Sequence, residues 1–228
     1  VIVETIQGEG GINVASNTWL RKLERVCREF DVLLIVDDIQ TGCGRTGTFF
    51  SFENSGISPD MITLSKSLSG SGLPMALVLI KPELDKWAPG EHNGTFRGNN
   101  PAFVTANAAI QTYWRDDEFM RSVEFKSKIL KKRIEQLIQS LPAGFSHKGR
   151  GLMQALSCPN GDLAEAISKT AFENGLLIET CGAESQVLKF FMPLTISVGL
   201  LNEGMDIFED AIGAVCGKAS EDVVLKAV

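Results

Sequence analysis

The spacing of apolar residues predicts strands that alternate with helices in the first half of the chain. Short apolar runs typical of buried strands lie at residues 1–6, 32–36, 61–64 and 75–80. Between the first two runs, Ser16 is a suitable N-cap for an amphipathic helix that extends to about Phe30. A strand, a helix and a strand in this order build a parallel sheet through a right-handed crossover. We therefore expect an α/β fold with a mostly parallel sheet.

The second half of the chain predicts a smaller α+β domain, with a boundary between residues 117 and 118. A helix at residues 102–114 is expected before this boundary, and a long helix at 117–141 follows. The small domain should further contain helices at 162–173 and 201–215 and strands at 152–156, 176–179 and 187–191. The long helix carries a basic cluster, which we interpret as a solvated face. This cluster comprises Lys128, Lys131, Lys132 and Arg133.

Two of the strand-like runs lead to an ionisable residue. The run at 32–36 ends at Asp37, and the run at 61–64 delivers Ser65 and Lys66. Ligands of open parallel α/β sheets bind just beyond the carboxyl ends of the strands, so we expect Asp37 and Lys66 to face one pocket. The alternative is a purely structural ion pair between them.

Composition narrows the function classes. The 228 residues are 44% hydrophobic and 22% charged, so the chain can bury a core and is neither disordered nor fibrous by composition. The formal net charge is -6 and the pI is near 5.1. Proteins that bind the phosphate backbone carry a basic footprint instead, so we expect no nucleic-acid partner.

Cysteine and histidine usage argues against a disulfide framework and against a metal site. The five cysteines are never spaced as C-x-x-C, and the only histidines are His92 and His147. A reducing compartment is the simpler interpretation. No apolar run approaches the roughly 18–20 residues of a membrane span. We therefore expect a cytoplasmic protein with no membrane partner and no bound metal.

Four motifs in one order resemble the cofactor site of the class III (ω-amino) aminotransferases. They occupy residues 37–42, 44–47, 59–66 and 72–74, and they include Asp37-Asp38-Ile39-Gln40 and Thr63-Leu64-Ser65-Lys66. The resemblance implies pyridoxal 5'-phosphate (PLP) as cofactor and the fold type I architecture of PLP-dependent transferases. Residues 1–117 would then be the C-terminal part of the large PLP-binding domain, and residues 118–228 the small C-terminal domain.

The chemistry of that family explains the residue types. A lysine attaches the cofactor as a Schiff base and then moves a proton between substrate and cofactor, and Lys66 matches this lysine. A carboxylate keeps the pyridine nitrogen protonated, and Asp37 matches it. By the same resemblance, Ile39 packs on the cofactor ring and Gln40 hydrogen-bonds its phenolic oxygen. Asp38 departs from the family, which usually has glutamate there.

The resemblance adds three residues outside this region. The segment Gln7-Gly8-Glu9-Gly10 matches a family loop whose glutamate pairs with a cation near the substrate, so Glu9 is a substrate-binding candidate. Thr95 matches a threonine that reaches the cofactor phosphate of a second subunit, which implies a homodimer or a higher homo-oligomer. A plain turn is the alternative at both places.

Lys189 is the third of these residues. Several family members have an arginine at this position, where it binds a substrate carboxylate as a fork. Lysine offers only a point charge, so the replacement is not conservative for planar recognition. Lys189 is therefore a substrate-binding candidate, and a solvated charge at a strand end is the alternative.

Within the family, residues 74–82, 90–100 and 148–154 are most similar to the branch that acts in ectoine biosynthesis. That branch moves the 4-amino group of L-2,4-diaminobutyrate to 2-oxoglutarate, which gives L-aspartate 4-semialdehyde and L-glutamate. Ornithine and 4-aminobutyrate aminotransferases and aminomutases are alternatives. A non-catalytic PLP-binding or dimerisation fragment is another, because the resemblance covers only about the later half of such an enzyme. We expect the chain alone to bind PLP poorly and not to transaminate.

Overall fold

The chain divides into two compact units, which we describe separately. The computed structural model describes residues 1–95 and 97–225, with side chains as far as residue 217. The first unit comprises Val1–Ile6 and Ala15–Ser122, and the second comprises Gln7–Val14 and Val123–Val228. The expected domain boundary between residues 117 and 118 stays a prediction, because a compact unit is not by itself a domain.

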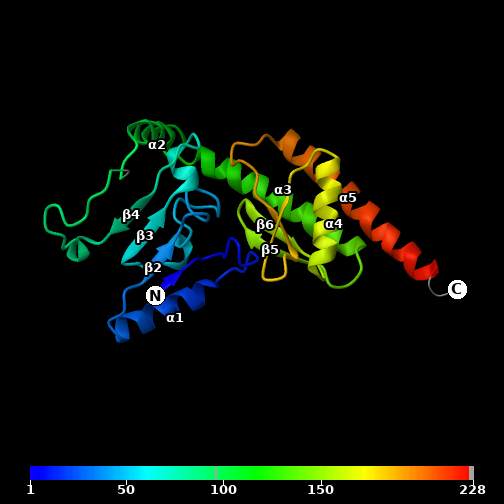
Figure 1. Cartoon of the computed structure of the whole chain (residues 1–228), viewed down its shortest axis with the longest axis horizontal. Helices are drawn as coiled ribbons and strands as arrows, with labels where there is room; N and C mark the ends of the chain where they lie inside the picture. Colours follow the sequence, from blue (N-terminus) through cyan, green and yellow to red (C-terminus); the bar gives the residue numbers. More distant parts are fainter. Residues whose placement is uncertain (96, 226–228) are drawn as a thin grey trace. The chain divides into compact units, whose positions relative to one another are not determined.

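A four-stranded sheet forms the centre of the first unit. Its strands are β1 (Ile2–Val3), β2 (Ile35–Asp37), β3 (Met61–Leu64) and β4 (Leu77–Ile80). They lie side by side in chain order, with β1, β2 and β3 parallel and β4 antiparallel to β3 (Figure 1). The predicted run of parallel strands is confirmed, and the sheet is mixed because the last strand reverses.

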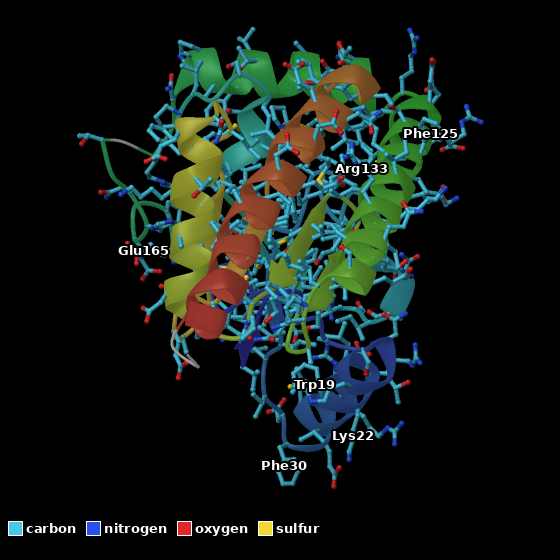
Figure 2. All side chains as sticks on the ribbon, turned by 90° about the vertical axis from the view of Figure 1, so that its right-hand side faces the viewer. Trp19, Lys22, Phe30, Phe125, Arg133 and Glu165 are labelled. Atoms are coloured by element: carbon cyan, nitrogen blue, oxygen red, sulfur yellow. The ribbon has the colours of Figure 1, made fainter. Side chains whose placement is uncertain are left out.

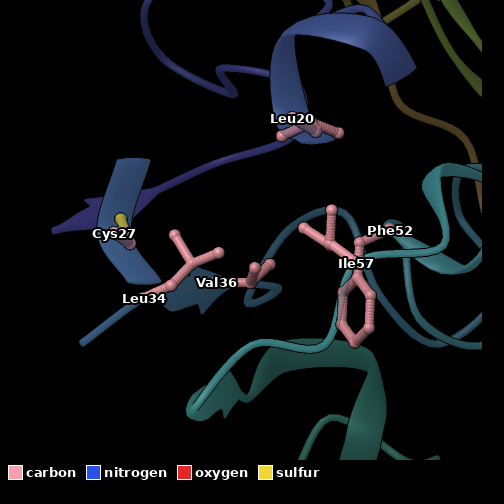
Figure 3. Packing of buried hydrophobic residues seen from close by; sticks show 6 residues of the cluster. All are labelled: Leu20, Cys27, Leu34, Val36, Phe52 and Ile57. Atoms are coloured by element: carbon pink, nitrogen blue, oxygen red, sulfur yellow. The ribbon is translucent and has the colours of Figure 1, made fainter. Parts of the chain in front are cut away.

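Helix α1 (Asn17–Glu29) connects β1 to β2, as the sequence predicted. The hydroxyl of Ser16 caps it by accepting a hydrogen bond from the amide of Trp19 at 3.1 Å. A hydrophobic cluster joins residues of this helix to alternate residues of the sheet (Figure 3). Its buried members are Leu20, Cys27, Leu34, Val36, Phe52 and Ile57. One face of the sheet is thereby committed to the core, and Ile35 and Asp37 point to the opposite face.

Asp60 connects three parts of the first unit. Its Oδ2 accepts hydrogen bonds from Arg28 of α1 at 2.6 Å and from the Leu34 amide at 2.8 Å, and its Oδ1 accepts one from Lys81 at 2.9 Å. Burial opposes ionisation, but these donors outweigh it and lower the pKa of the Asp60 carboxyl to about 2. One buried carboxylate, just before β3, thus holds together the end of α1 and the residue that precedes β2.

Strand β4 differs from the prediction. The apolar run at 75–80 suggested a buried strand, but Val78 is 53% exposed and Leu79 is 39% exposed. β4 is the last strand of the sheet and only β3 pairs with it, so one of its edges has no neighbour among the described strands. Apolar content alone does not report whether a strand is central or lies at an edge.

Three short 3₁₀ helices and one α-helix complete the first unit. They are η1 (Glu53–Ser55), η2 (Lys66–Ser69), η3 (Pro82–Leu84) and α2 (Asn100–Tyr113). Gly70 ends η2 with φ +72°, and a side chain at this position would collide with Ala109 of α2. This close approach places η2 against α2, and Lys66 is the first residue of η2.

The second unit contains an antiparallel sheet in the order β5-β6-β8-β7, together with helices. The strands are β5 (Ser146–Arg150), β6 (Met153–Ser157), β7 (Glu179–Cys181) and β8 (Val187–Phe190). The helices are α3 (Glu118–Ser140), whose first turns belong to the first unit, α4 (Gly161–Glu173) and α5 (Val198–Leu225). The predicted α+β content is confirmed, with β5 unforeseen and α5 longer than expected.

The interpretation of the basic cluster on α3 is wrong for Arg133. This guanidinium is bonded to Glu209 Oε1 at 2.9 Å and to Asp206 Oδ1 at 2.6 Å, so it lies between α3 and α5 (Figure 2). Lys126, about two turns earlier, is buried and donates to the carbonyls of Leu194 and Ile196 at 2.6 and 3.2 Å. Two cations of this helix are therefore structural.

Candidate active site

Asp37 ends β2 on the face of the sheet that the hydrophobic cluster does not use. Its Oδ1 accepts a hydrogen bond from the Ile39 amide at 3.0 Å. The described residues donate no hydrogen bond to its other carboxylate oxygen, Oδ2. A half-buried carboxylate with one oxygen fixed and one available is suited to receive a charged N–H group.

Asp38, the next residue, has a different environment. It is 1% exposed, and its Oδ1 accepts from the Thr41 hydroxyl at 2.6 Å while its Oδ2 accepts from the Ser51 amide at 2.9 Å. The carboxylate is thus used to hold the turn after β2, and an aspartate satisfies this turn where the family usually has glutamate. Asp38 is therefore a structural group, whereas Asp37 keeps one carboxylate oxygen available for a ligand.

Lys66 begins η2 directly after β3. It is exposed, and its backbone has φ +51°, a left-handed conformation that is costly for a residue with a side chain. Ser65 before it is anchored through a hydrogen bond from its hydroxyl to the Met75 carbonyl at 2.6 Å. Among the described residues the Lys66 ammonium makes no hydrogen bond or ion pair. The alternative of a structural ion pair with Asp37 is therefore wrong.

The remaining cofactor candidates lie in loops of the first unit. Ile39 and Gln40 are half-buried at the start of the turn after Asp37. Thr95 is exposed in the loop between η3 and α2. Cys43 lies in the same turn as Gln40 with φ +54°, and burial together with the charge of Asp38 raises the pKa of its thiol to about 11. This thiol stays protonated at neutral pH.

The second unit brings Glu9 and Lys189 together. Lys189 on β8 is 4% exposed, and its Nζ lies 3.0 Å from Glu9 Oε1 and 3.5 Å from Glu179 Oε2. The ammonium also lies 5.4 Å from the centre of the Phe191 ring. The alternative of a solvated charge at a strand end is therefore wrong, since Lys189 is a buried cation between two carboxylates.

Glycine explains how the loop that carries Glu9 reaches β7. Gly11 has φ +100°, and a Cβ atom there would lie 3.1 Å from the Cα of Gly182. The Gly182 amide donates to the Glu9 carbonyl at 2.9 Å, and Lys148 donates to Asn13 Oδ1 at 2.6 Å. The glycine-rich segment is therefore more than a plain turn, because its backbone packs directly on another strand end.

Sequence reasoning did not single out Glu179 or Thr63. Glu179 is the cross-strand neighbour of Lys189, and this register depends on the pairing of β7 with β8. Thr63 is the neighbour of Asp37 across the pairing of β2 with β3. Register can be inferred only once two strands are paired, so the only signal in the sequence was the parity of each position within its strand.

Each unit contains a cavity near its candidate residues. In the first unit a cavity of about 1060 Å³ is lined by Ser65, Val78 and Trp87 among others, but neither Asp37 nor Lys66 lines it. In the second unit a cavity of about 390 Å³, mostly apolar, has Glu179 and Lys189 in its wall. The described residues contain no cluster of acidic, histidine or cysteine side chains arranged to hold a metal ion. No described helix has the length and apolar character needed to cross a bilayer.

Comparison with known proteins decides the family. The model of the aminotransferase class-III family matches residues 1–212. The chain belongs to the class-III aminotransferases. Enzymes of this family use PLP, and the mixed, mostly parallel sheet of the first unit agrees with fold type I.

Relatives and solved structures of this aminotransferase family cover nearly the whole chain. The diaminobutyrate--2-oxoglutarate transaminase of Vibrio parahaemolyticus is 55% identical over 96% of this chain and 52% of its own length. The enzyme of the same name from Vibrio cholerae is 59% identical over 92% of this chain and 51% of its own length. The ornithine aminotransferase structure from Toxoplasma gondii, described with PLP at its active site, has a TM-score of 0.85 at 30% identity, covering 94% of this chain and 50% of that one. This aminotransferase chain thus spans about half the length of the curated relatives it matches.

The residues of the first unit fit the family's cofactor. Asp37 Oδ2 is available to a protonated ring nitrogen, and Lys66 presents an amine without a partner among the described residues from a strained backbone. The hydroxyl of Thr63, beside Asp37, is a buried polar group that makes no hydrogen bond within the described chain. Unused polar groups at the end of adjacent strands are suited to receive a polar ligand.

Proposed function

We propose that the intact protein is a PLP-dependent aminotransferase that moves the 4-amino group of L-2,4-diaminobutyrate to 2-oxoglutarate. The observation that carries this proposal is the placement of Asp37 and Lys66 after adjacent parallel strands, with one carboxylate oxygen and one amine available. The substrate is supported by the names of relatives that are 52–59% identical. The products would be L-aspartate 4-semialdehyde and L-glutamate, as in ectoine biosynthesis.

PLP supplies the electron-accepting ring that lets an amino acid lose a proton next to its nitrogen. In our proposal Asp37 binds the ring nitrogen and maintains its positive charge, since an opposite charge in contact favours the protonated form. Ile39 packs against the ring, and Gln40 donates a hydrogen bond to its phenolic oxygen. Lys66 provides the amine that attaches the cofactor and afterwards holds and moves the proton at the substrate carbon.

Substrate recognition is assigned to Glu9 and Lys189 in the second unit. Lys189 supplies a buried positive charge for a substrate carboxylate, but Glu9 occupies it in this structure. A carboxylate can therefore bind Lys189 only if Glu9 moves away or shares the ammonium. The Glu9 side chain is 72% exposed and that of Glu179 is 68% exposed, so both carboxylates have room to move away from the buried ammonium.

The assembly in our proposal is a homodimer in which Thr95 contacts the cofactor phosphate of the partner subunit. Helix α2 supports this, because it exposes large apolar side chains, including Phe103 (41%), Val104 (69%) and Ile110 (43%). Exposed apolar surface of this kind commonly marks a protein interface. We further propose that residues 1–117 belong to the large domain and 118–228 to the small domain of a cytoplasmic enzyme.

Two measurements on the intact protein test the proposed function. The Lys66→Ala variant should lose the visible absorbance that borohydride removes from the wild type, because no amine remains to attach PLP. Retention of that absorbance would contradict the role of Lys66. With 2-oxoglutarate as acceptor, kcat/KM should be higher for L-2,4-diaminobutyrate than for ornithine or 4-aminobutyrate. An equal or reversed preference would assign the protein to another member of the family.

A further inference from the structure

Thr63 and Asp37 are neighbours on the same face of the sheet. They are register partners across the parallel pair β2 and β3. Their strand neighbours Val36 and Ile62, which are also register partners, point to the other face and pack in the hydrophobic cluster. Adjacent strands lie about 4.8 Å apart, so the Thr63 hydroxyl lies within side-chain reach of the Asp37 carboxylate.

The Thr63 hydroxyl is a buried polar group with no hydrogen bond in the described part of the chain. Its oxygen is closed to solvent although the residue as a whole is only half-buried. An unsatisfied buried hydroxyl costs about 1–3 kcal/mol relative to a satisfied one. A valine would have the same shape and an equally good strand propensity without this cost. Shape and propensity therefore do not explain a hydroxyl at this position.

Asp37 offers the matching acceptor. Its Oδ1 is fixed by the Ile39 amide, whereas Oδ2 receives no hydrogen bond from the described residues. The Thr63 hydroxyl can both donate and accept, and a carboxylate can accept up to about two hydrogen bonds on each oxygen. Oδ2 therefore has capacity for the hydroxyl and for the protonated nitrogen of a bound cofactor at the same time.

We propose that Thr63 is a positioning residue that donates a hydrogen bond to the Asp37 carboxylate when PLP is bound, and so keeps that carboxylate ionised and oriented toward the ring nitrogen. This inference rests on the proposed function. Thr63 acts through Asp37, because a second donor stabilises the charged carboxylate and thereby the positive charge that it maintains on the ring. The hydroxyl that is unsatisfied in the free chain becomes satisfied on binding.

The test compares three variants of the intact protein. Thr63→Val removes the hydroxyl and keeps the shape, and Thr63→Ser keeps the hydroxyl and removes the methyl group. Thr105→Val is the matched control, since the Thr105 hydroxyl already donates to the Ala102 carbonyl inside α2. The readouts are the PLP dissociation constant, from titration of the visible absorbance, and the pH midpoint of that absorbance.

Thr63→Val should weaken PLP binding about tenfold or more, because a hydrogen bond to a charged group is lost. Its absorbance midpoint should move to higher pH, because the ring then holds less positive charge. Thr63→Ser and Thr105→Val should stay within about threefold of the wild type in affinity, with unchanged midpoints.

Wild-type affinity and midpoint in Thr63→Val would overturn the inference. Equal losses in Thr63→Val and Thr63→Ser would also overturn it, because the methyl group and not the hydroxyl would then be responsible. If the wild type shows no borohydride-sensitive absorbance with PLP, the proposed function fails first, and this inference fails with it. Normal wild-type binding with an unaffected Thr63→Val variant would refute this inference alone.

Discussion

The Nζ of Lys189 lies 3.0 Å from Glu9 Oε1, although the two residues are 180 positions apart in sequence. The two side chains differ in burial, since the side chain of Lys189 is 3% exposed and that of Glu9 is 72% exposed. Glu179, on the neighbouring strand, lies 3.5 Å from the same ammonium. The lysine is thus held in place while the glutamate of the loop can leave, and this asymmetry gives the first prediction.

Changes at Glu9 and Lys189 should move the KM for 2-oxoglutarate in opposite directions. Lys189→Met should raise this KM about tenfold, because a cation that binds a carboxylate is lost. Glu9→Gln should lower it, because the competing carboxylate is neutralised. Lys148→Met is the control, since Lys148 contacts the same loop through Asn13 and not through Glu9. Steady-state kinetics at fixed amino donor measure all three, and a parallel shift of both variants would contradict the assignment.

Replacement of either adjacent aspartate should give a different defect. Asp37→Asn should leave stability almost unchanged but slow turnover by more than about a hundredfold, or about 3 kcal/mol of transition-state stabilisation. Asp38→Asn should instead lower the free energy of unfolding by about 2 kcal/mol, because its NH₂ group would face one of the two buried donors, the Thr41 hydroxyl or the Ser51 amide, and its oxygen could accept from only the other. Urea unfolding and single-turnover kinetics distinguish the two defects. Similar profiles for both variants would show that the structural assignment of the pair is wrong.

Asp60 should make the first unit sensitive to acid. Its pKa in the folded state is about 2, below the ordinary value of 3.8, so the charged form stabilises the fold at neutral pH. This contribution is complete above the pKa of the unfolded chain and is lost as pH falls from about 4 toward 2. Asp60→Asn should be less stable at pH 7 by about 2 kcal/mol, and the difference should shrink over that pH range. Glu135→Gln is the control, because its pair with Lys131 is exposed on both sides. A pH-independent difference between the wild type and Asp60→Asn would contradict the linkage.

Lys126→Met should destabilise the second unit. The carbonyls of Leu194 and Ile196 would lose their donor, which costs about 1–3 kcal/mol for a buried acceptor. Lys128→Met, two positions away on the exposed side of α3, should have little effect, because its partner Glu124 is also exposed. Thermal unfolding of the two variants makes the comparison. Equal stability of Lys126→Met and the wild type would show that the two carbonyls find other donors.

The sequence predicted most elements of the fold from apolar periodicity. Helix α1, its Ser16 cap and strand β3 were expected where they lie. Strand β5 was not predicted, because its residues, 146–150, show no alternation of apolar and polar side chains. The strand forms through its pairing with β6. The position of β4 at the edge of the sheet also could not be predicted, since it depends on the sheet topology and not on the composition of the strand.

Only those residues of the candidate site that belong to sequence motifs could be predicted. Asp37 and Lys66 were recognised as residues at strand ends, and their roles remain proposals. The burial of Lys189 and its second partner Glu179 depend on the register of β7 and β8, which a single sequence does not specify. The same holds for Thr63, whose significance comes from the residue beside it on β2.

Residues Gln7–Val14 belong to the second unit although the segments on either side of them belong to the first. This arrangement fixes the order in which parts of the second unit can assemble during translation. Glu9 is synthesised 180 residues before its partner Lys189. At typical elongation rates of about 5–20 residues per second, the glycine-rich loop waits roughly ten to forty seconds for the strand on which it packs. The second unit joins residues 7–14 to a sheet that is synthesised much later, so it can close only after β8 has been made.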